Sequence, residues 1–141
     1  MKNLTAIALF VAAGIATAGS ALAQDHKVTA NVPFSFTVNG RTLPAGHYTL
    51  GSEVNTPRML TISDREKGIA VMAITVPDYG ASADNKLVFH RYGGQYFLSE
   101  VRTTNEATTC HLPTSKQEKW AKSQTQEASV PDNHEVLIAL N

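Results

Sequence analysis

Cysteine is almost absent from this chain of 141 residues, because Cys110 is the only one. A single cysteine excludes an internal disulfide, so the hydrophobic core has to stabilise the fold without a cross-link. We expect Cys110 to be buried, since free thiols in oxidising compartments tend to be buried or excluded. The alternative that stays open is a reactive thiol, acting as a sensor, in an intermolecular disulfide, or as a nucleophile paired with a histidine.

An excess of charge of one sign is also lacking. The chain has 12 basic and 12 acidic residues, and charged residues make up only 17% of it. Nucleic acids and anionic membranes bind to surfaces rich in Lys and Arg. The balance therefore argues against nucleic acid, or an anionic membrane, as the main partner.

Recognisable catalytic and metal-binding motifs are missing as well. The histidines at positions 26, 47, 90, 111 and 134 form neither His-x-His nor His-Glu-x-x-His, the close spacings typical of zinc sites. Gly-x-Ser-x-Gly and glycine-rich phosphate loops do not occur either. We therefore predict no cofactor and no metal, assign no catalytic residue, and favour a non-enzymatic protein over an enzyme.

The N-terminus carries the one long hydrophobic run. Lys2 precedes an uncharged stretch from Leu4 to Leu22, and residues 21–23 (Ala-Leu-Ala) have the small-x-small pattern of a signal peptidase site. We predict a cleaved secretory signal peptide over residues 1–23 and a single β-rich domain over residues 24–141, periplasmic or extracellular and without a transmembrane segment. The alternative is an uncleaved membrane anchor, because the run is just long enough to span a bilayer.

Two-residue alternation is the main pattern in the rest of the chain. From Val28 to Val38 every second residue is apolar, Phe34 and Phe36 among them, and the intervening residues are polar or Pro. Successive side chains of a strand point to opposite faces, so the pattern predicts one long strand with one apolar face. Covering that face requires a second layer, which predicts further strands.

Turn residues divide the remaining chain into these strands. Asn39-Gly40 and Gly93-Gly94 favour tight turns, and the second pair joins residues 86–92 to residues 95–102 in the clearest hairpin. We expect other strands over residues 47–54, 58–63, 69–76 and 135–140, the first of these pairing antiparallel with residues 28–38. Residues 69–76 are apolar on both faces, which predicts a central strand or a covered one.

A helix is expected in the C-terminal half. Ser115 and Glu118 have the spacing of a capping box, and Trp120 is expected to anchor a narrow apolar stripe of the helix on the body. The predicted fold class is mainly β: a compact antiparallel β-sandwich or small barrel of about seven strands with this one helix.

Three stretches of the chain together resemble a family of small exported proteins of acidobacteria and related soil bacteria. They are VPFSFTVNGRTLPAGHYTL, LVFHRYGGQYFLSEV and LPTSKQEKW, which contain a Pro-Phe-x-Phe strand, Leu-Pro-Ala-Gly-x-Tyr, a Phe-His-x-Tyr-Gly hairpin and a helix after Leu-Pro-x-Ser. This family has no established activity. The resemblance implies export and a compact β-rich domain, and it carries over no catalytic residue.

Candidate ligand-binding residues gather on the predicted hairpin. His90, Tyr92 and Glu100 lie on its two strands, and Tyr48 lies on an earlier strand. Together they are a candidate polar patch at the mouth of a pocket, with an ordinary solvated sheet face as the alternative. Tyrosines 48, 79, 92 and 96 are a candidate aromatic surface for sugars or peptides, or else ordinary strand residues.

The function we expect is a binding or structural role in the cell envelope or periplasm, with a protein partner or as a homodimer. Such a role predicts an exposed apolar patch or an unprotected sheet edge. A carrier of a small apolar ligand is the first alternative, and it predicts a cavity lined by Phe34, Phe36, Leu50 and Val88. A hydrolase that uses a histidine and Cys110 is the second alternative, ranked last.

Overall fold

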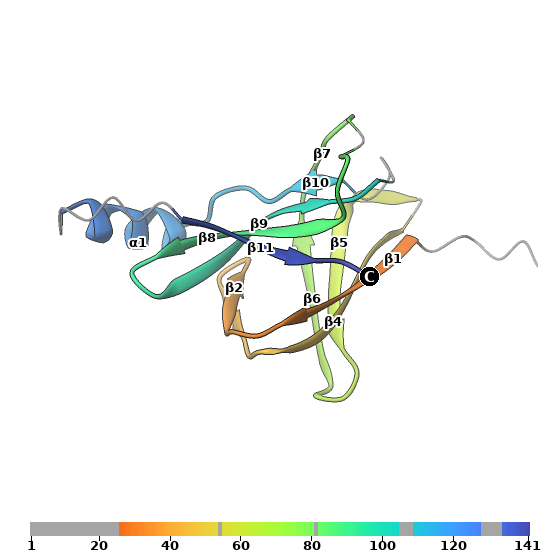
Figure 1. Ribbon diagram of the computed structural model, residues 1–141, viewed down its shortest axis with the longest axis horizontal. Coiled ribbons are helices and arrows are strands. Elements are labelled where there is room, and N and C mark those ends of the chain that lie inside the picture. Colours follow the sequence, from red (N-terminus) through yellow and green to blue (C-terminus); the bar gives the residue numbers. More distant parts are fainter. Residues whose placement is uncertain (1–25, 54, 81, 105–108, 128–133) are drawn as a thin grey trace, which may run out of the picture.

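The computed structural model describes residues 26–53, 55–80, 82–104, 109–127 and 134–141. Within these residues the chain forms eleven strands and one helix, α1 (Lys116–Glu127) (Figure 1). The predicted signal peptide, residues 1–23, lies outside the described residues. In the described part, no helix has the length and apolar character needed to cross a membrane.

Four antiparallel strands form the first sheet. In spatial order they are β1 (His26–Val32), β4 (Gly46–Glu53), β5 (Thr56–Asp64) and β6 (Ile69–Ile74). The predicted antiparallel pairing of the first two is confirmed, with Ala30 opposite Tyr48. The side chains that point into the molecule from this sheet include Ala30, Tyr48, Leu60 and Val71, all buried.

Seven strands form the second sheet. Five of them follow the order β11 (His134–Ala139), β8 (Lys86–Tyr92), β9 (Gln95–Arg102), β10 (Cys110–His111) and β7 (Val76–Pro77). The other two, β2 (Phe36–Val38) and β3 (Arg41–Leu43), form a hairpin beside β9. Thr37 of β2 lies opposite Phe97 of β9 in a parallel pair, and the remaining pairings of this sheet are antiparallel.

The two sheets are joined at two corners. Only Thr75 separates β6 from β7, and its N–H donates to the carbonyl of Arg58 at 2.8 Å. At the second corner Thr29 and Asn141 exchange two backbone hydrogen bonds, at 3.1 and 2.9 Å. Figure 1 shows the strands of the two sheets crossing steeply. The fold is therefore mainly β and compact, with one helix in its C-terminal half, as predicted.

The strand predicted over residues 28–38 is two strands in different sheets, which corrects the prediction. β1 ends at Val32, and residues 33–35 lie outside any strand before β2 begins. Pro33 has no N–H for a ladder hydrogen bond, which favours a break at this point. The alternation survives the break, because Val32 and Phe36 are buried and Phe34 is packed against the core. Breaks of this kind raise the number of strands above the expected seven.

The strand predicted over residues 69–76 is present as β6, Ile69–Ile74, but the prediction that it is central or covered on both faces is wrong. Among the described residues β6 is the last strand of its sheet, and only its inner face, with Val71 and Ala73, is buried. Met72 and Ile74 on the outer face are 61% and 70% exposed. The chain leaves this sheet after Ile74 and continues as β7 in the other one, and within the described residues the outer face of β6 stays largely exposed.

Both predicted tight turns are confirmed. Asn39 and Gly40, between β2 and β3, have φ of 49° and 76°. Gly93 and Gly94, between β8 and β9, have φ of 57° and 93°. Positive φ at both central residues is the type I′ pattern, which matches the twist of a two-residue hairpin and explains the Asn and Gly found there.

Aromatic rings fill the centre of the molecule. The Phe36 ring lies 5.2 Å from the Tyr48 ring and 5.3 Å from the Phe89 ring, measured between centroids. Phe34 packs edge-on against Phe89 at 5.1 Å and stacks on Tyr96 at 4.0 Å. Edge-to-face and offset-stacked contacts of this kind add to the free energy of burial.

The helix α1 packs on β8 and β9 with one small apolar residue. Ala121 forms a buried cluster with Tyr92 and Phe97, whereas Trp120 is 61% exposed and does not anchor the helix as predicted. Half of the predicted capping box is present, because the Glu118 N–H donates to Ser115 Oγ at 3.1 Å. The Glu118 carboxylate reaches the second sheet and contacts His90.

Candidate functional site

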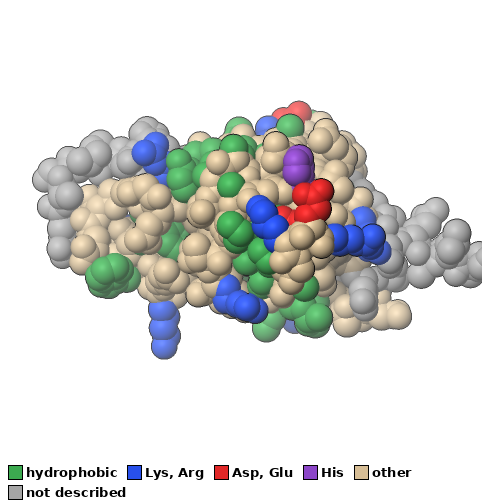
Figure 2. Space-filling view, turned by 90° about the horizontal axis from the view of Figure 1, so that it is seen from below, with side chains coloured by type: hydrophobic (Ala, Val, Ile, Leu, Met, Phe, Trp, Pro, Cys, Tyr) green, Lys and Arg blue, Asp and Glu red, His purple; other side chains and the backbone are tan. Residues whose placement is uncertain are grey.

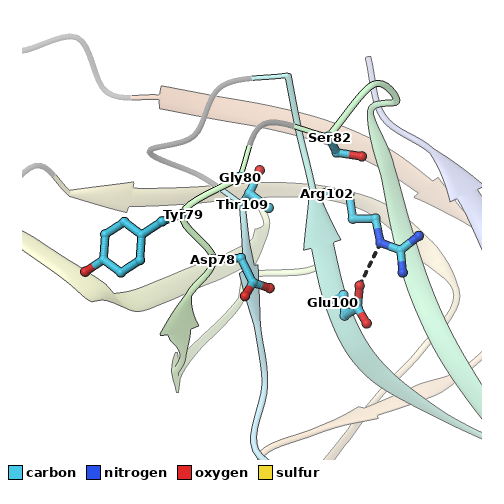
Figure 3. Close-up of a pocket in the computed structure, with 7 residues that line it drawn as sticks. All are labelled: Asp78, Tyr79, Gly80, Ser82, Glu100, Arg102 and Thr109. Atoms are coloured by element: carbon cyan, nitrogen blue, oxygen red, sulfur yellow. Dashed lines mark hydrogen bonds and ion pairs between the residues drawn. The ribbon is translucent and has the colours of Figure 1, made fainter.

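An open polar pocket lies at the corner where the second sheet meets the segment after β7 (Figure 3). Its volume is about 520 Å³, within the range of small-molecule sites. We call it the polar pocket, and the described residues that line it are Asp78, Tyr79, Gly80, Ser82, Glu100, Arg102 and Thr109.

Backbone hydrogen bonds hold the walls of the polar pocket together. The Asp78 N–H donates to the Thr109 carbonyl at 3.0 Å, and the Ser82 N–H donates to the Thr103 carbonyl at 3.2 Å. The Thr109 hydroxyl in turn donates to the Thr103 carbonyl at 2.9 Å, and both threonines are buried. The segment after β7 is thus tied to the end of β9 and the start of β10.

Charged side chains of both signs face the polar pocket. Arg102 Nε donates to Glu100 Oε2 at 2.7 Å, the contact dashed in Figure 3. This hydrogen bond raises the pKa of Arg102 above its usual value. Asp78 Oδ2 lies 3.1 Å from Nδ1 of His111, a residue of β10. Each carboxylate is therefore held in position through one of its oxygens.

Tyr79 gives the polar pocket an aromatic end. Its side chain is 94% exposed, the largest exposure among the apolar and aromatic side chains described. Figure 3 shows its ring extending away from the Glu100–Arg102 pair, on the far side of Asp78. The pocket thus has a charged end and an aromatic end.

The structure distributes the predicted ligand-binding residues over three places. Glu100 lines the polar pocket. His90 and Tyr92 lie under α1, where His90 Nδ1 is 2.9 Å from Glu118 Oε1 and the rings of His90 and Tyr92 are 6.1 Å apart. Tyr48 is 1% exposed in the core, and its hydroxyl donates to the Pro44 carbonyl. These four residues therefore do not form one site.

Burial raises the pKa of Tyr48 and of Tyr92, the two enclosed tyrosines among these four residues. Desolvation raises the pKa of Tyr48, with a smaller contribution from the charge of Asp64. Desolvation also raises the pKa of Tyr92, with a smaller contribution from Glu118. Both phenols therefore stay neutral over a wider pH range than in water, which disfavours their phenolate forms.

Most of the residues that line the polar pocket were not predicted from the sequence. Residues 77–85 read as a loop by composition, and the Asp, Tyr and Ser within it carry no spacing that indicates a site. Their contact with Glu100 and Arg102 depends on the pairing of β7 with β10, two strands of two residues each. Strands this short have no periodic pattern, so only the polar loop itself could have pointed to the site.

Cys110 is a buried core residue in the structure. It is 6% exposed, and burial raises the pKa of its thiol to about 11, against a smaller lowering by a hydrogen bond with Thr75. The thiolate is the nucleophilic form, and it is scarce at neutral pH when the pKa is this high. The structure therefore lends no support to the reactive-thiol alternative. Among the described residues, no group of three or more His, Cys, Asp or Glu side chains is arranged to hold a metal ion.

A second surface feature is apolar and lies on the edge of the first sheet. Its exposed side chains, which we call the β6 row, are Met59, Met72, Ile74 and Val76. Met59 is the cross-strand partner of Ile74, Met72 and Ile74 lie on the same face of β6, and Val76 follows the corner at Thr75 as the first residue of β7. Their exposed fractions run from 37% to 70%.

The charges of the surface are mixed on the face seen in Figure 2. Lys and Arg side chains lie next to Asp and Glu side chains there, between separate hydrophobic patches. No field of one sign covers this face. Association of this face with a partner would therefore depend on local contacts more than on long-range steering.

Comparison with known proteins gives no relative. Neither a protein-family model, nor a curated protein, nor a solved structure matches this chain. The resemblance to exported proteins of acidobacteria therefore stays a prediction, and function has to be argued from the geometry.

Proposed function

We propose that this protein is a non-enzymatic exported β-domain that assembles in the cell envelope or periplasm through the edge of its first sheet. The observation that carries the proposal is the β6 row, in which Met72 and Ile74 lie on the edge strand β6 and Met59 and Val76 lie on the neighbouring strands β5 and β7. The occupant of the edge is β6 of a second copy, which makes the assembled unit a homodimer.

The edge of β6 lacks the usual protection against pairing. Exposed edges are normally blocked by charged side chains, Pro, bulges or a covering element. β6 reads Ile-Ala-Val-Met-Ala-Ile, without a charge or a Pro, and its register with β5 is regular from Met59 to Asp64. Among the described strands, none pairs with its outer edge. Such an edge is a template for another strand.

A second copy fits this edge by symmetry and by charge. Two identical strands that pair antiparallel about a two-fold axis form an isologous contact, in which the same patch is buried on both subunits. Met72 and Ile74 of both copies then lie on one face of a continuous sheet. Because β6 carries no charged residue, the two strands meet without like-charge repulsion.

The interior argues against the carrier alternative. A carrier needs space between Phe34, Phe36 and their neighbours, whereas the rings of Phe34 and Phe36 both contact the Phe89 ring. Val88 is buried but lies outside the core cluster that contains those rings. The hydrolase alternative is disfavoured, because burial raises the pKa of the Cys110 thiol to about 11 and so disfavours the nucleophilic thiolate.

The proposal is tested by native mass spectrometry and sedimentation equilibrium on residues 24–141. We expect a concentration-dependent dimer, and we expect Ile74→Lys to weaken it by at least about tenfold, about 1.4 kcal/mol, because it places a charge on each of the two uncharged strands that pair. Leu137→Lys is the matched control, since Leu137 is 50% exposed on a strand of the other sheet. A monomer at all concentrations, or equal weakening by Leu137→Lys, contradicts the proposal.

A further inference from the structure

We propose that the polar pocket is a binding site for a neutral oligosaccharide of at least two sugar units. This site is distinct from the β6 row and does not depend on the function proposed above. The inference combines the mixed charges at one end of the pocket with the exposed Tyr79 ring at the other.

The charges of the pocket select against ions and apolar molecules. The lining residues Asp78 and Glu100 outnumber Arg102, so an anion meets more negative than positive side chains. Glu100 is paired with Arg102 and Asp78 contacts His111, so a cation has to compete with contacts that each carboxylate already makes. An apolar ligand would leave these polar groups without water, which is unfavourable.

A neutral polyol suits the same groups. Each sugar hydroxyl both donates and accepts, carboxylates accept, and a guanidinium donates in a fixed planar fork. The contact of Arg102 with Glu100 uses one of five guanidinium N–H donors, and each carboxylate contact uses one of its two oxygens. These side chains are therefore held in place by one another while their remaining donor and acceptor positions can bind neighbouring hydroxyls.

The position of Tyr79 sets the minimum length of the ligand. Sugar rings carry a face of C–H groups that packs on aromatic rings, and Tyr79 offers an almost fully exposed ring. This ring extends away from the Glu100–Arg102 pair in Figure 3. A ligand of two sugar units can occupy both parts of the pocket, with one unit at the charged end and one on the ring.

Backbone geometry supports a preformed site. The hydrogen bonds of Asp78 with Thr109 and of Ser82 with Thr103 fix the segment after β7 against the second sheet. Arg102 and Glu100 are on β9, a strand paired with both β8 and β10. A ligand therefore meets walls that are already in place, which lowers the entropic cost of binding.

The test is an NMR titration of the uniformly ¹⁵N-labelled protein, residues 24–141, with cellobiose, maltose and N,N′-diacetylchitobiose, and with glucose as the single-unit probe. We expect saturable shifts of the Arg102, Thr103 and Thr109 amides with at least one disaccharide, with a Kd on the order of 1 mM, and at least about fivefold weaker binding of glucose. Sodium acetate and a neutral dipeptide amide serve as the anionic and peptide probes.

Two variants sharpen the titration. Tyr79→Ala should weaken disaccharide binding at least about fivefold, about 1 kcal/mol, while leaving the glucose affinity unchanged. Trp120→Ala is the matched control, because Trp120 is also exposed but lies on α1. The disaccharide affinity of Trp120→Ala should equal that of the unmodified protein. The absence of saturable shifts with all three disaccharides, an equal loss in Trp120→Ala, or stronger binding of acetate or the dipeptide overturns the proposal.

Discussion

The outer faces of the two sheets differ in how far their apolar side chains are buried. The seven-stranded sheet carries α1 on β8 and β9, so Tyr92 and Phe97 are 6% and 2% exposed. The four-stranded sheet leaves Met72 and Ile74 on its outer face 61% and 70% exposed. Both sheets carry large apolar side chains on these outer faces. Whether an apolar strand face is buried or exposed therefore depends on the element that packs on it, and not on the sequence of the strand alone.

The cover on the seven-stranded sheet is itself thin. Ala121 is the one residue of α1 in the buried cluster with Tyr92 and Phe97, and Glu118 adds a polar contact with His90. A helix with so narrow an apolar face depends on its tertiary contacts to stay folded.

The largest effect that we expect is a loss of stability when a buried apolar side chain is truncated, with almost no loss when an exposed one is truncated. Phe89→Ala should lower the free energy of unfolding by about 3–5 kcal/mol, because Phe89 is 0% exposed among aromatic rings. Met72→Ala should change it by less than about 0.5 kcal/mol under conditions where the protein is monomeric. Urea unfolding followed by circular dichroism measures both. Equal losses would mean that β6 is covered within the monomer.

The second largest effect that we expect is a loss of stability at high pH, caused by the burial of the Cys110 thiol. Its pKa is raised to about 11 in the folded state against 9.0 for a free thiol, so the folded state holds the proton more tightly. The contribution of the buried, protonated thiol to the free energy of unfolding is fully present below pH 9, and it is lost as the pH rises from 9 to about 11. A shift of this size corresponds to about 2–3 kcal/mol.

The measurement is urea unfolding between pH 8 and pH 11. Cys110→Ala should retain more of its stability above pH 9 than the unmodified protein does. It should not abolish the decline above pH 10, because Tyr48 and Tyr92 also have raised pKa values. Identical pH profiles for the two proteins would show that the Cys110 thiol is accessible to water.

Much of the fold could be predicted from local patterns. The Asn-Gly and Gly-Gly turns, the hairpin of β8 and β9, and the Ser115 cap all depend on residues close together in sequence. The edge position of β6 could not be predicted, because it depends on where the chain changes sheet at Thr75. The polar pocket was missed for the same reason, since Asp78 meets Arg102 only through long-range pairing.

The smallest effect we expect is at the contact that holds the helical cover. Glu118→Ala removes the hydrogen bond to His90, a residue that is about one quarter exposed, and should cost about 1 kcal/mol. The fluorescence of Trp120, the single tryptophan, reports the state of α1. We expect faster quenching by acrylamide in Glu118→Ala and no change in Met72→Ala. Unchanged quenching in Glu118→Ala would mean that Ala121 alone holds the helix.

The most direct test of the central claim is hydrogen exchange of the β6 amides at two protein concentrations, about 1 µM and about 100 µM, because exchange reports local opening and pairing. An open edge that pairs with a second copy predicts slower exchange of residues 69–74 at the higher concentration, with residues 86–92 of β8 unchanged. Exchange of residues 69–74 that is the same at both concentrations, in a protein that stays monomeric, would contradict it.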